Sequence, residues 1–436
     1  MKRRAGRQKH LFFSFTKKNP GLPVLAALFA VLCLPSCKDA ESSVAVLWTD
    51  RPDFAFYAGY FNASQDRYKV EVLQRAFPPA ARYGESSGKI PDIAVAGYLR
   101  GALVREYLVP LEPHLETEGG FTEAFYPSLL SAGNFDGKQY LLPVSFNTAL
   151  IAFDSANENL LSGPLTVGLD EMTQLGLSFN RTSGGRFSRI GFSPSWDGGF
   201  LFTAASMLGA DFEEARPLSW NGEALGLAMD RMREWDTAAN GETGNIADFT
   251  FRFFTVPPAA MLLSGRILFA YMDSSSFFTL NTAQRESLDF RWLAGNERIP
   301  LTEDTAYLGL TKAGRAPKAA WAFVRWFFDS ETQLEMLEKS RQFRQMETSF
   351  GIAGGFSSLR PVTQQFFPRF YPALMGRIPP EDFLVPQGPL PGDWPAMKEQ
   401  AVLPYLKDRA MPQPEAGSTG ASLEARLAEW VRLNRL

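Results

Sequence analysis

The chain has 436 residues, of which 45% are hydrophobic and 21% are charged, so it is long enough for two hydrophobic cores and too apolar for wholesale disorder. Seven of its 44 basic residues lie in residues 1–36, which contain no acidic residue, so the remainder carries 37 basic and 47 acidic residues. A chain this acidic is not expected to bind nucleic acid.

Histidine and cysteine are too scarce for several kinds of chemistry, since each occurs only twice. A zinc site built from them needs about four ligands, and a serine or cysteine nucleophile usually needs a histidine within reach. His10 lies in the basic leader, which leaves His114 in a Leu-Glu-Pro-His-Leu context that is typical of a surface or structural histidine. We therefore expect no metal site and no cofactor.

The first 36 residues have the features of a secretory signal peptide. Basic residues precede an apolar run of 14 residues, 21–34, which is shorter than the roughly 20 residues of a membrane span. The run ends in Leu34-Pro35-Ser36-Cys37, which resembles the lipobox of bacterial lipoproteins. This resemblance implies a diacylglycerol thioether on Cys37, a polar tether over residues 37–43 and a location on the cell membrane, facing the periplasm or the outside. An ordinary cleaved signal with an incidental cysteine is the alternative.

Three short apolar runs follow, at Val44–Trp48, Tyr68–Leu73 and Ile93–Ala96, each bounded by polar or turn residues. Their composition predicts strands, and the longer segments between them have helical content. Such an alternation is typical of β-α-β units, so we expect a parallel sheet.

Ligands of open α/β sheets bind beyond the carboxyl ends of the strands. Asp50, Asp53 and Tyr98 follow two of these ends, so we predict that they contact a ligand, although acids in such loops can also be solvated surface residues. Trp48 closes the first strand. We predict that it is a flat platform on which a sugar ring stacks, with a packed core side chain as the alternative.

Residues 135–153 read FDGKQYLLPVSFNTALIAF and contain two apolar runs around a short polar bridge at 144–148. Asp136-Gly137 supplies a tight turn, and Pro143 interrupts the first run. The bridge is too short for a helix and too polar for a core, so we predict that it crosses between two compact halves. Asn147, within it, is a predicted ligand contact.

The pattern DGK-x-Y-x-L-P followed by an apolar strand resembles the extracellular solute-binding proteins of ABC importers, in the branch that binds sugars and oligosaccharides. Pro91-Asp92-Ile93 matches the same family. The most specific match combines Gly309-Leu310-Thr311-Lys312, an Ala-Trp-x-Phe helix within residues 318–330, and a capping-box pattern that begins at Ser330.

The resemblance implies a periplasmic-binding-protein-like α/β fold, in which two lobes are joined by crossing hinge strands and enclose a ligand cleft. Residues 44–145 and 304–350 would form the first lobe, and residues 146–303 and 351–436 the second. The implied function is capture of a small solute, with a sugar favoured, and its delivery to the permease subunits of an ABC importer. The protein itself would be a monomer and not an enzyme.

The resemblance also implies that three loops of the second half reach the cleft. Two of them follow predicted strands at 190–192 and 267–272, and the third is the glycine-rich segment 351–360. The predicted contacts in these loops are Trp196, Asp197, Asp273, Ser275, Phe277, Phe356 and Ser357. Trp196 would be a second stacking platform, unless it packs in the core.

Two other functions fit the same sequence. A membrane-anchored glycosidase needs two carboxylates about 5–10 Å apart and no histidine, and a binding lipoprotein can act as a sensor without a transporter. The acidic composition also leaves a cationic ligand, such as a polyamine, as the alternative to a sugar.

Val167 stands where the family commonly has Trp, which makes this chain a divergent member.

Overall fold

The computed structural model describes residues 42–75, 90–241, 243–411 and 420–434, and Ser42–Leu436 form one compact unit. The predicted signal peptide, Cys37 and most of the predicted tether lie outside the described residues. None of the described helices combines the length and the apolar composition of a membrane span.

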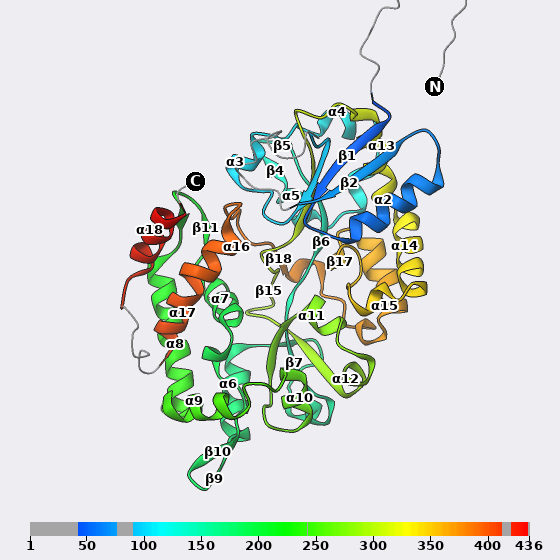
Figure 1. The fold of residues 1–436 in the computed structure, drawn as a ribbon. Helices are drawn as coiled ribbons and strands as arrows, with labels where there is room; N and C mark the ends of the chain where they lie inside the picture. Colours follow the sequence, from blue (N-terminus) through cyan, green and yellow to red (C-terminus); the bar gives the residue numbers. More distant parts are fainter. Residues whose placement is uncertain (1–41, 76–89, 242, 412–419, 435–436) are drawn as a thin grey trace, which may run out of the picture. The chain divides into compact units, whose positions relative to one another are not determined.

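Six strands form the larger sheet, in the order β17-β6-β16-β3-β1-β2 (Figure 1). They are β1 (Val44–Thr49), β2 (Lys69–Gln74), β3 (Ile93–Ala96), β6 (Leu142–Phe146), β16 (Ala306–Leu310) and β17 (Phe356–Ser357). β1 pairs in parallel with β2 and β3, whereas β16 pairs antiparallel with β3 and β6. The three parallel strands are therefore confirmed, each within one residue of its predicted bounds. The antiparallel strands make the sheet mixed, which the β-α-β pattern did not predict.

Four strands form the smaller sheet, in the order β13-β7-β14-β8. They are β7 (Ala149–Asp154), β8 (Thr166–Val167), β13 (Ala270–Asp273) and β14 (Leu288–Leu293). The remaining strands form four short pairs: β4 (Asn134–Phe135) with β5 (Lys138–Gln139), β9 (Arg181–Ser183) with β10 (Arg186–Arg189), β11 (Glu213–Glu214) with β12 (Leu218–Ser219), and β15 (Ile299–Pro300) with β18 (Leu384–Val385).

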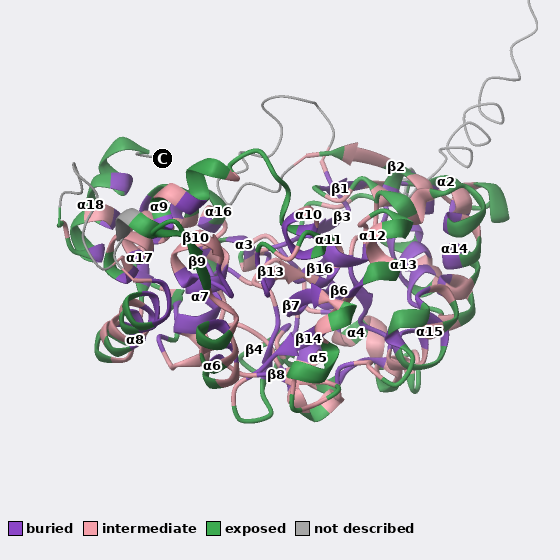
Figure 2. Ribbon diagram, turned by 90° about the horizontal axis from the view of Figure 1, so that it is seen from below, coloured by how far each residue is buried: buried purple, intermediate pink, exposed green. Residues whose placement is uncertain are grey.

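Helices pack around both sheets, so that the strands are largely buried and the helices expose one face (Figure 2). The α-helices are α2 (Asp53–Ser64), α3 (Ala102–Arg105), α4 (Glu112–Leu115), α5 (Pro127–Ser131), α6 (Leu169–Phe179), α7 (Gly198–Met207), α8 (Gly222–Asn240), α9 (Thr243–Arg252), α10 (Pro258–Leu263), α11 (Ser274–Phe278), α12 (Thr282–Ser287), α13 (Pro317–Phe327), α14 (Ser330–Gln342), α15 (Phe367–Phe370), α16 (Trp394–Met397), α17 (Leu403–Ala410) and α18 (Leu423–Leu433). Short 3-10 or π segments are η1 (Phe121–Ala124), η2 (Ser155–Leu160), η3 (Pro194–Trp196), η4 (Gln345–Glu347), η5 (Val362–Phe366), η6 (Pro372–Leu374), η7 (Glu381–Phe383) and η8 (Lys398–Val402).

The region with the most specific sequence match folds as a strand followed by two helices. The α13 helix buries one apolar stripe, which includes Phe323 and Phe327. The α14 helix begins one residue earlier than the capping-box pattern predicts, because the Asp329 carboxylate accepts the hydrogen bond of the Thr332 main-chain N–H at 2.8 Å. Ser330 is therefore the first helical residue and not the cap.

The Pro91-Asp92 motif has a structural role. The buried carboxylate of Asp92 accepts main-chain hydrogen bonds from Val46 at 2.8 Å, Arg315 at 2.5 Å and Ala316 at 2.7 Å. It thereby satisfies otherwise unpaired donors at the start of α13 and attaches this helix to β1.

The chain passes from the larger sheet to the smaller at Asn147-Thr148, between β6 and β7, so the predicted crossing is confirmed for these two residues. The rest of the predicted bridge, residues 144–146, belongs to β6, and residues 144–148 are all buried, so the expectation that the bridge is too polar for a core was wrong. It returns between β14 and β16, and β15 in this return pairs in parallel with β18. The two sheets are thus joined by the segments that link their strands.

The position of the segment after residue 350 differs from the predicted lobe boundary. Phe356 of β17 pairs with Phe146 of β6, which places β17 in the larger sheet. The ring of Phe350 stacks on Phe278 of α11 at 4.8 Å, and the ring of Phe356 contacts Trp292 of β14 at 5.9 Å. These contacts join residues far apart in sequence, so no local pattern reports them. They form an aromatic bridge between the two sheets.

A second set of contacts lies near α3 and α16, which Figure 1 shows on the side away from α15. Arg100 donates to the carbonyl oxygen of Gln387 at 2.6 Å, and the main-chain N–H of Ala102 donates to Oε2 of Glu214 at 2.7 Å. These contacts are polar and partly exposed, in contrast to the buried aromatic bridge.

Candidate functional site

A polar cavity of about 460 Å³ lies where β1 and β13 end and where the chain crosses at Asn147. The residues that line it are Asp50, Arg51, Pro52, Asp53, Asn147, Asp273, Ser275, Ser276, Asp304, Thr348, Ser349, Ala353 and Gly354. β1 belongs to the larger sheet and β13 to the smaller, so both sheets supply side chains. The cavity is therefore the site at which a ligand would contact both halves of the fold.

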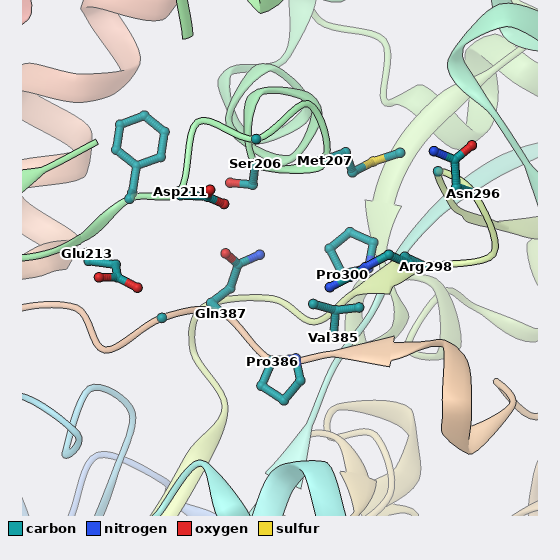
Figure 3. A pocket seen from close by; sticks show the side chains of 14 residues that line it. Ser206, Met207, Asp211, Glu213, Asn296, Arg298, Pro300, Val385, Pro386 and Gln387 are labelled. Carbon is teal, nitrogen blue, oxygen red and sulfur yellow. The ribbon is translucent and has the colours of Figure 1, made fainter. Parts of the chain in front are cut away.

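Another polar cavity, of about 440 Å³, lies beside β15 and β18 (Figure 3). Its polar side chains include Asp211, Glu213, Arg298 and Gln387. None of the predicted site residues and no strand of the larger sheet line it. It does not join the two sheets at their strand ends, so the cavity of Asp50 and Asp273 is the better candidate.

Arg51 holds two carboxylates at the edge of the candidate cavity. Its Nε lies 3.3 Å from Oδ1 of Asp50, and its Nη2 lies 3.5 Å from Oδ2 of Asp304. The same Nη2 donates to the main-chain oxygen of Asp304 at 2.7 Å. One guanidinium therefore connects the loop after β1 with the residues that precede β16.

The start of α2 is attached to the segment that follows α14. Oδ1 of Asp53 accepts a hydrogen bond from the hydroxyl of Ser349 at 2.6 Å, and the hydroxyl of Tyr57 accepts one from the main-chain N–H of Ala353 at 2.9 Å. Asp53 occupies the first turn of α2, where the helix dipole stabilises a negative charge. The loop at 348–354 is thus placed by α2.

Asn147 is buried at the crossing, and both ends of its side-chain amide form hydrogen bonds within the protein. Its Nδ2 donates to the carbonyl oxygen of Gly354 at 2.9 Å, and its Oδ1 accepts from the hydroxyl of Ser274 at 2.6 Å. Its main-chain oxygen accepts from the N–H of Thr302 at 2.9 Å. Asn147 therefore fixes the positions of three segments that surround the cavity.

Burial and like charges raise the pKa of two carboxyl groups in the cavity. The pKa of Asp50 is raised mainly because burial disfavours its charged form, and the neighbouring Arg51 offsets only part of this effect. The pKa of Asp273 is raised mainly by burial, with further contributions from the charges of Asp304 and Glu303. Asp273 also caps α11, where Oδ1 accepts the Ser276 N–H at 2.6 Å.

The cavity has an excess of negative charge. Asp50, Asp53, Asp273 and Asp304 line it, and Arg51 is the one basic residue among the lining residues that the structure describes. Glu303 lies close enough to raise the pKa of Asp273, but it forms an ion pair with Lys398. A ligand in this cavity would therefore face several carboxylates and a single guanidinium.

Five of the predicted contacts line the cavity together: Asp50, Asp53, Asn147, Asp273 and Ser275. Tyr98 does not line it, but it lies nearby in a left-handed backbone conformation with a φ of 57°. Burial, together with the negative charges of Glu303 and Asp304, raises the pKa of its hydroxyl.

The predicted aromatic contacts lie elsewhere. Trp48 is 5% exposed and packs with Ala94, Ala96 and Leu99, because β1 is a central strand whose two faces are both covered. Phe277 and Phe356 are fully buried in the core that joins the two sheets. Neither of the two predicted stacking platforms, Trp48 and Trp196, lines the cavity.

The remaining three predicted contacts have structural partners away from the cavity. Trp196 stacks on Phe249 with ring centroids 5.9 Å apart. Asp197 caps α7 by accepting the Phe200 N–H at 3.1 Å. The buried hydroxyl of Ser357 donates to Oε1 of Gln333 at 2.6 Å. Each of these side chains thus has a contact within the protein, and none of them lines the cavity.

Several lining residues were not predicted. Arg51 and Asp304 are the most informative of them. Arg51 stands between two predicted acids, and Asp304 directly precedes a crossing strand, so position alone could have indicated both. Ser349, Ala353 and Gly354 reach the cavity through long-range contacts with α2 and Asn147, which have no local sequence signal.

Within the described part of the chain, no group of three or more His, Cys, Asp or Glu side chains is arranged to hold a metal ion. The carboxylates of the cavity are therefore best considered as hydrogen-bond acceptors and as charges that act on a solute.

The sequence model of one protein family, described as bacterial extracellular solute-binding protein, matches residues 57–344. Among curated protein sequences none matches the chain significantly.

Solved structures share the fold at low sequence identity. A sugar-binding protein from Xanthomonas citri superposes with a TM-score of 0.60 at 13% identity, covering 89% of this chain and 96% of that chain. An ABC substrate-binding protein from Listeria monocytogenes in complex with cycloalternan has a TM-score of 0.57 at 13% identity, covering 88% and 96%. The maltose-maltodextrin binding protein of Alicyclobacillus acidocaldarius has a TM-score of 0.52 at 16% identity, covering 89% and 99%. The predicted periplasmic-binding-protein-like fold is confirmed.

Proposed function

The chain belongs to the family of bacterial extracellular solute-binding proteins, and on this basis we propose that it captures a small carbohydrate between its two sheets and delivers it to the permease of an ABC importer. The observation that carries the proposal is the polar cavity, to which Asp50 comes from the larger sheet and Asp273 from the smaller. A carbohydrate is supported by similar folds that include a sugar-binding protein and a complex with cycloalternan.

The arrangement of the cavity supports binding by closure. Carboxylates accept hydrogen bonds from sugar hydroxyls, and serine hydroxyls can donate as well as accept. A solute held by Asp50 and Asp53 alone would gain the contacts of Asp273 and Ser275 when the two sheets approach. It would therefore bind the closed form more tightly and shift the population towards it. A permease can then distinguish the loaded protein from the empty one by its shape.

The charge of the cavity favours a second candidate, a solute that carries a protonated amine. Four carboxylates line the cavity, and its one guanidinium is already paired with Asp50 and Asp304. Closing a low-dielectric site over unpaired carboxylates is costly, and an ammonium group would offset that cost. No aromatic side chain is among the described residues that line the cavity, so the stacking surface used for neutral sugars is not part of this site. Amino sugars and polyamines carry the required charge.

The organisation of the whole chain completes the proposal. We propose a first lobe built on the larger sheet, with residues 350–374 packed against it, and a second lobe built on the smaller sheet. Cleavage before Cys37 and lipidation of its thiol would anchor the protein, as a monomer, on the outer face of the cell membrane. The cavity would then open to the outside of the cell, where the solute is collected.

The test is a binding screen with residues 42–436, the compact unit of the structure. Neutral oligosaccharides, amino sugars and polyamines are compared by thermal shift and then by calorimetry. A true ligand at a hundredfold excess over its Kd stabilises the protein by about 2.7 kcal/mol. If no member of the three classes stabilises it, the proposal fails. Chromatography of the recovered ligand checks the glycosidase alternative, which requires the release of shorter saccharides.

A further inference from the structure

A third cavity, of about 630 Å³, lies between η3, α9 and α10, at the end of the molecule opposite β1 (Figure 1). Its walls are apolar and include Trp196, Phe249 and Met261, and we call it the apolar pocket. No charged residue is among the described residues that line it, in contrast to the cavity of Asp50 and Asp273. A charged group placed here would lose its hydration without gaining an ion pair, so the pocket suits a neutral molecule. Its volume is that of a small-molecule site.

The aromatic walls of the apolar pocket are held in place by contacts within the protein. The rings of Trp196 and Phe249 are stacked, with centroids 5.9 Å apart and an interplanar angle of 14°. Phe249 is fully buried, and its ring also lies 4.9 Å from that of Phe253. Two further lining residues, Phe251 and Phe254, are 84% and 82% exposed. The pocket therefore offers a packed aromatic surface to the ring of a ligand, which would also remove exposed apolar area from water.

A buried polar network lies behind one wall of the apolar pocket. Asp236 of α8 is fully buried, and burial raises the pKa of its carboxyl group. Its Oδ1 accepts hydrogen bonds from the hydroxyl of Ser193 at 2.7 Å and from Nδ2 of Asn240 at 3.0 Å. The hydroxyl of Ser193 also lies 2.9 Å from the hydroxyl of Ser195, which lines the pocket. Ser195 thus connects a buried carboxyl group with an otherwise apolar cavity.

The directions of these hydrogen bonds leave Ser195 as an acceptor. Nδ2 of Asn240 also donates to the main-chain oxygen of Phe192 at 2.8 Å, which fixes the orientation of the amide. Oδ1 of Asp236 is therefore an acceptor for both of its partners, and a proton taken up by this carboxyl group would reside on Oδ2. Because the single hydrogen of the Ser193 hydroxyl is directed at Asp236, the hydroxyl of Ser195 must donate to Ser193. The lone pair that remains on Ser195 can only accept a hydrogen bond from a ligand.

We propose that the apolar pocket binds a small neutral phenol or aromatic alcohol, with its ring against Trp196 and its hydroxyl donating to Ser195. A hydroxyl group supplies the donor that Ser195 requires without bringing a charge into the pocket. A peptide segment fits less well, because each of its residues carries a main-chain N–H and a carbonyl that need partners. Ser195 and Thr250 have the only side-chain hydroxyls among the described residues that line the pocket.

The apolar pocket is separate from the proposed solute site. None of the residues that line it also lines the cavity of Asp50 and Asp273. It lies at the end of the molecule away from β1, whose first residue, Val44, follows the proposed tether. Occupation of the pocket therefore requires neither the proposed solute nor contact with the membrane, and it can be tested independently of the proposed function.

The experiment is calorimetry of residues 42–436 with p-cresol and with 4-methylanisole, which has the same ring but no hydrogen-bond donor. We expect saturable binding of one molecule per chain, with p-cresol bound about three- to tenfold more tightly because of its hydrogen bond to Ser195. Ser195→Ala should remove this preference and leave the affinity for 4-methylanisole unchanged. Ser131→Ala, at an exposed position of α5, is the matched control and should keep the preference.

Thr250→Trp tests the location of the site, because Thr250 is exposed and lines the pocket, which an indole side chain would fill. It should abolish the binding of both probes. Thr282→Trp, at an exposed position of α12 outside the pocket, should bind them as the parent does, and circular dichroism should show every variant folded. The proposal is overturned if neither probe binds saturably, if Thr250→Trp binds like the parent, or if Ser195→Ala keeps the preference for p-cresol. Self-association in sedimentation velocity that Thr250→Trp abolishes would instead identify an interface between copies and would also overturn it.

Discussion

The hydroxyl of Ser274 donates to the side-chain oxygen of Asn147 at 2.6 Å, across the point where the chain passes from one sheet to the other. The nitrogen of the same amide donates to the carbonyl of Gly354. One side chain thus satisfies a group from the smaller sheet and a group from the loop beside the larger one. Because Asn147 is 6% exposed, water cannot replace these bonds readily.

Asn147→Ala should therefore destabilise the protein. The substitution leaves the Ser274 hydroxyl and the Gly354 carbonyl without their partner, which costs about 1–3 kcal/mol for a buried polar group. Urea denaturation of residues 42–436 measures the loss. Ser276→Ala, at an exposed position of the same cavity, is the control and should change the free energy of unfolding little. Equal stability of Asn147→Ala and the parent would contradict the structural role of the amide.

Asp273 should make stability depend on pH. Its pKa is raised in the folded state, so the folded protein holds this proton more tightly than the unfolded chain does. The resulting stabilisation is complete below the ordinary pKa of an aspartate and is lost as the pH rises through the raised value.

Asp273→Asn removes that titration and keeps an N-cap for α11. We expect the variant to gain stability relative to the parent as the pH rises towards neutrality, as measured by Tm at a series of pH values. A difference in Tm that does not vary with pH would show that Asp273 is not the titrating group.

Arg51→Gln distinguishes the two ligand classes. The substitution removes the one positive charge among the described residues that line the cavity. An ammonium-bearing solute should then bind about five- to tenfold more tightly, because a like charge has been removed. A neutral saccharide should bind more weakly, because Asp50 and Asp304 lose the group that holds them. Calorimetry with both solutes decides, and Arg67→Gln, away from the cavity, controls for changes in net charge.

The aromatic bridge should contribute strongly to stability. Phe278 is 2% exposed, and its ring stacks on that of Phe350. Phe278→Ala should lower the free energy of unfolding by about 3–5 kcal/mol, as is typical of a buried phenylalanine. Phe251→Ala, at an 84% exposed position, should change it by less than about 0.5 kcal/mol. Similar effects of the two substitutions in urea denaturation would refute the packing described for Phe278.

Cys37→Ser tests the proposed anchor. In cells that express the full chain, we expect the parent in the membrane fraction and carrying lipid. The variant should lack the lipid, because serine has no thiol to form the thioether. Mass spectrometry of the purified proteins and fractionation of the cells measure both results. A parent protein whose Cys37 carries no lipid would exclude this anchor.

The three parallel strands of the larger sheet and the acids of the cavity could be predicted for the same reason. Apolar runs such as Val44–Trp48 report local strand structure, and a polar residue directly after a run must lie at the strand end. Asp50 and Asp273 are positioned in this way. Their presence in one cavity follows from the topology of the fold, which the resemblance supplied.

The aromatic contacts could not be predicted from the same information. A tryptophan at the end of a strand gives the same local sequence pattern whether its ring faces a ligand cleft or packs beneath the helices that cover the sheet. Trp48 is buried because helices cover both faces of β1, and that is decided by distant parts of the chain. The loop at 348–354 was missed for a related reason, since α2 and Asn147 place it through contacts across some 200 to 300 positions of sequence.

The aromatic bridge also limits how the protein can open. Separating the sheets at that edge would expose the rings of Phe278, Phe350, Phe356 and Trp292 to water, which is costly. The hydrogen bonds described on the other edge, such as that between Ala102 and Glu214, are polar and partly exposed and cost less to break. The easiest motion is therefore a rotation about an axis that runs along the bridge, and entry for a solute would widen first beside α3.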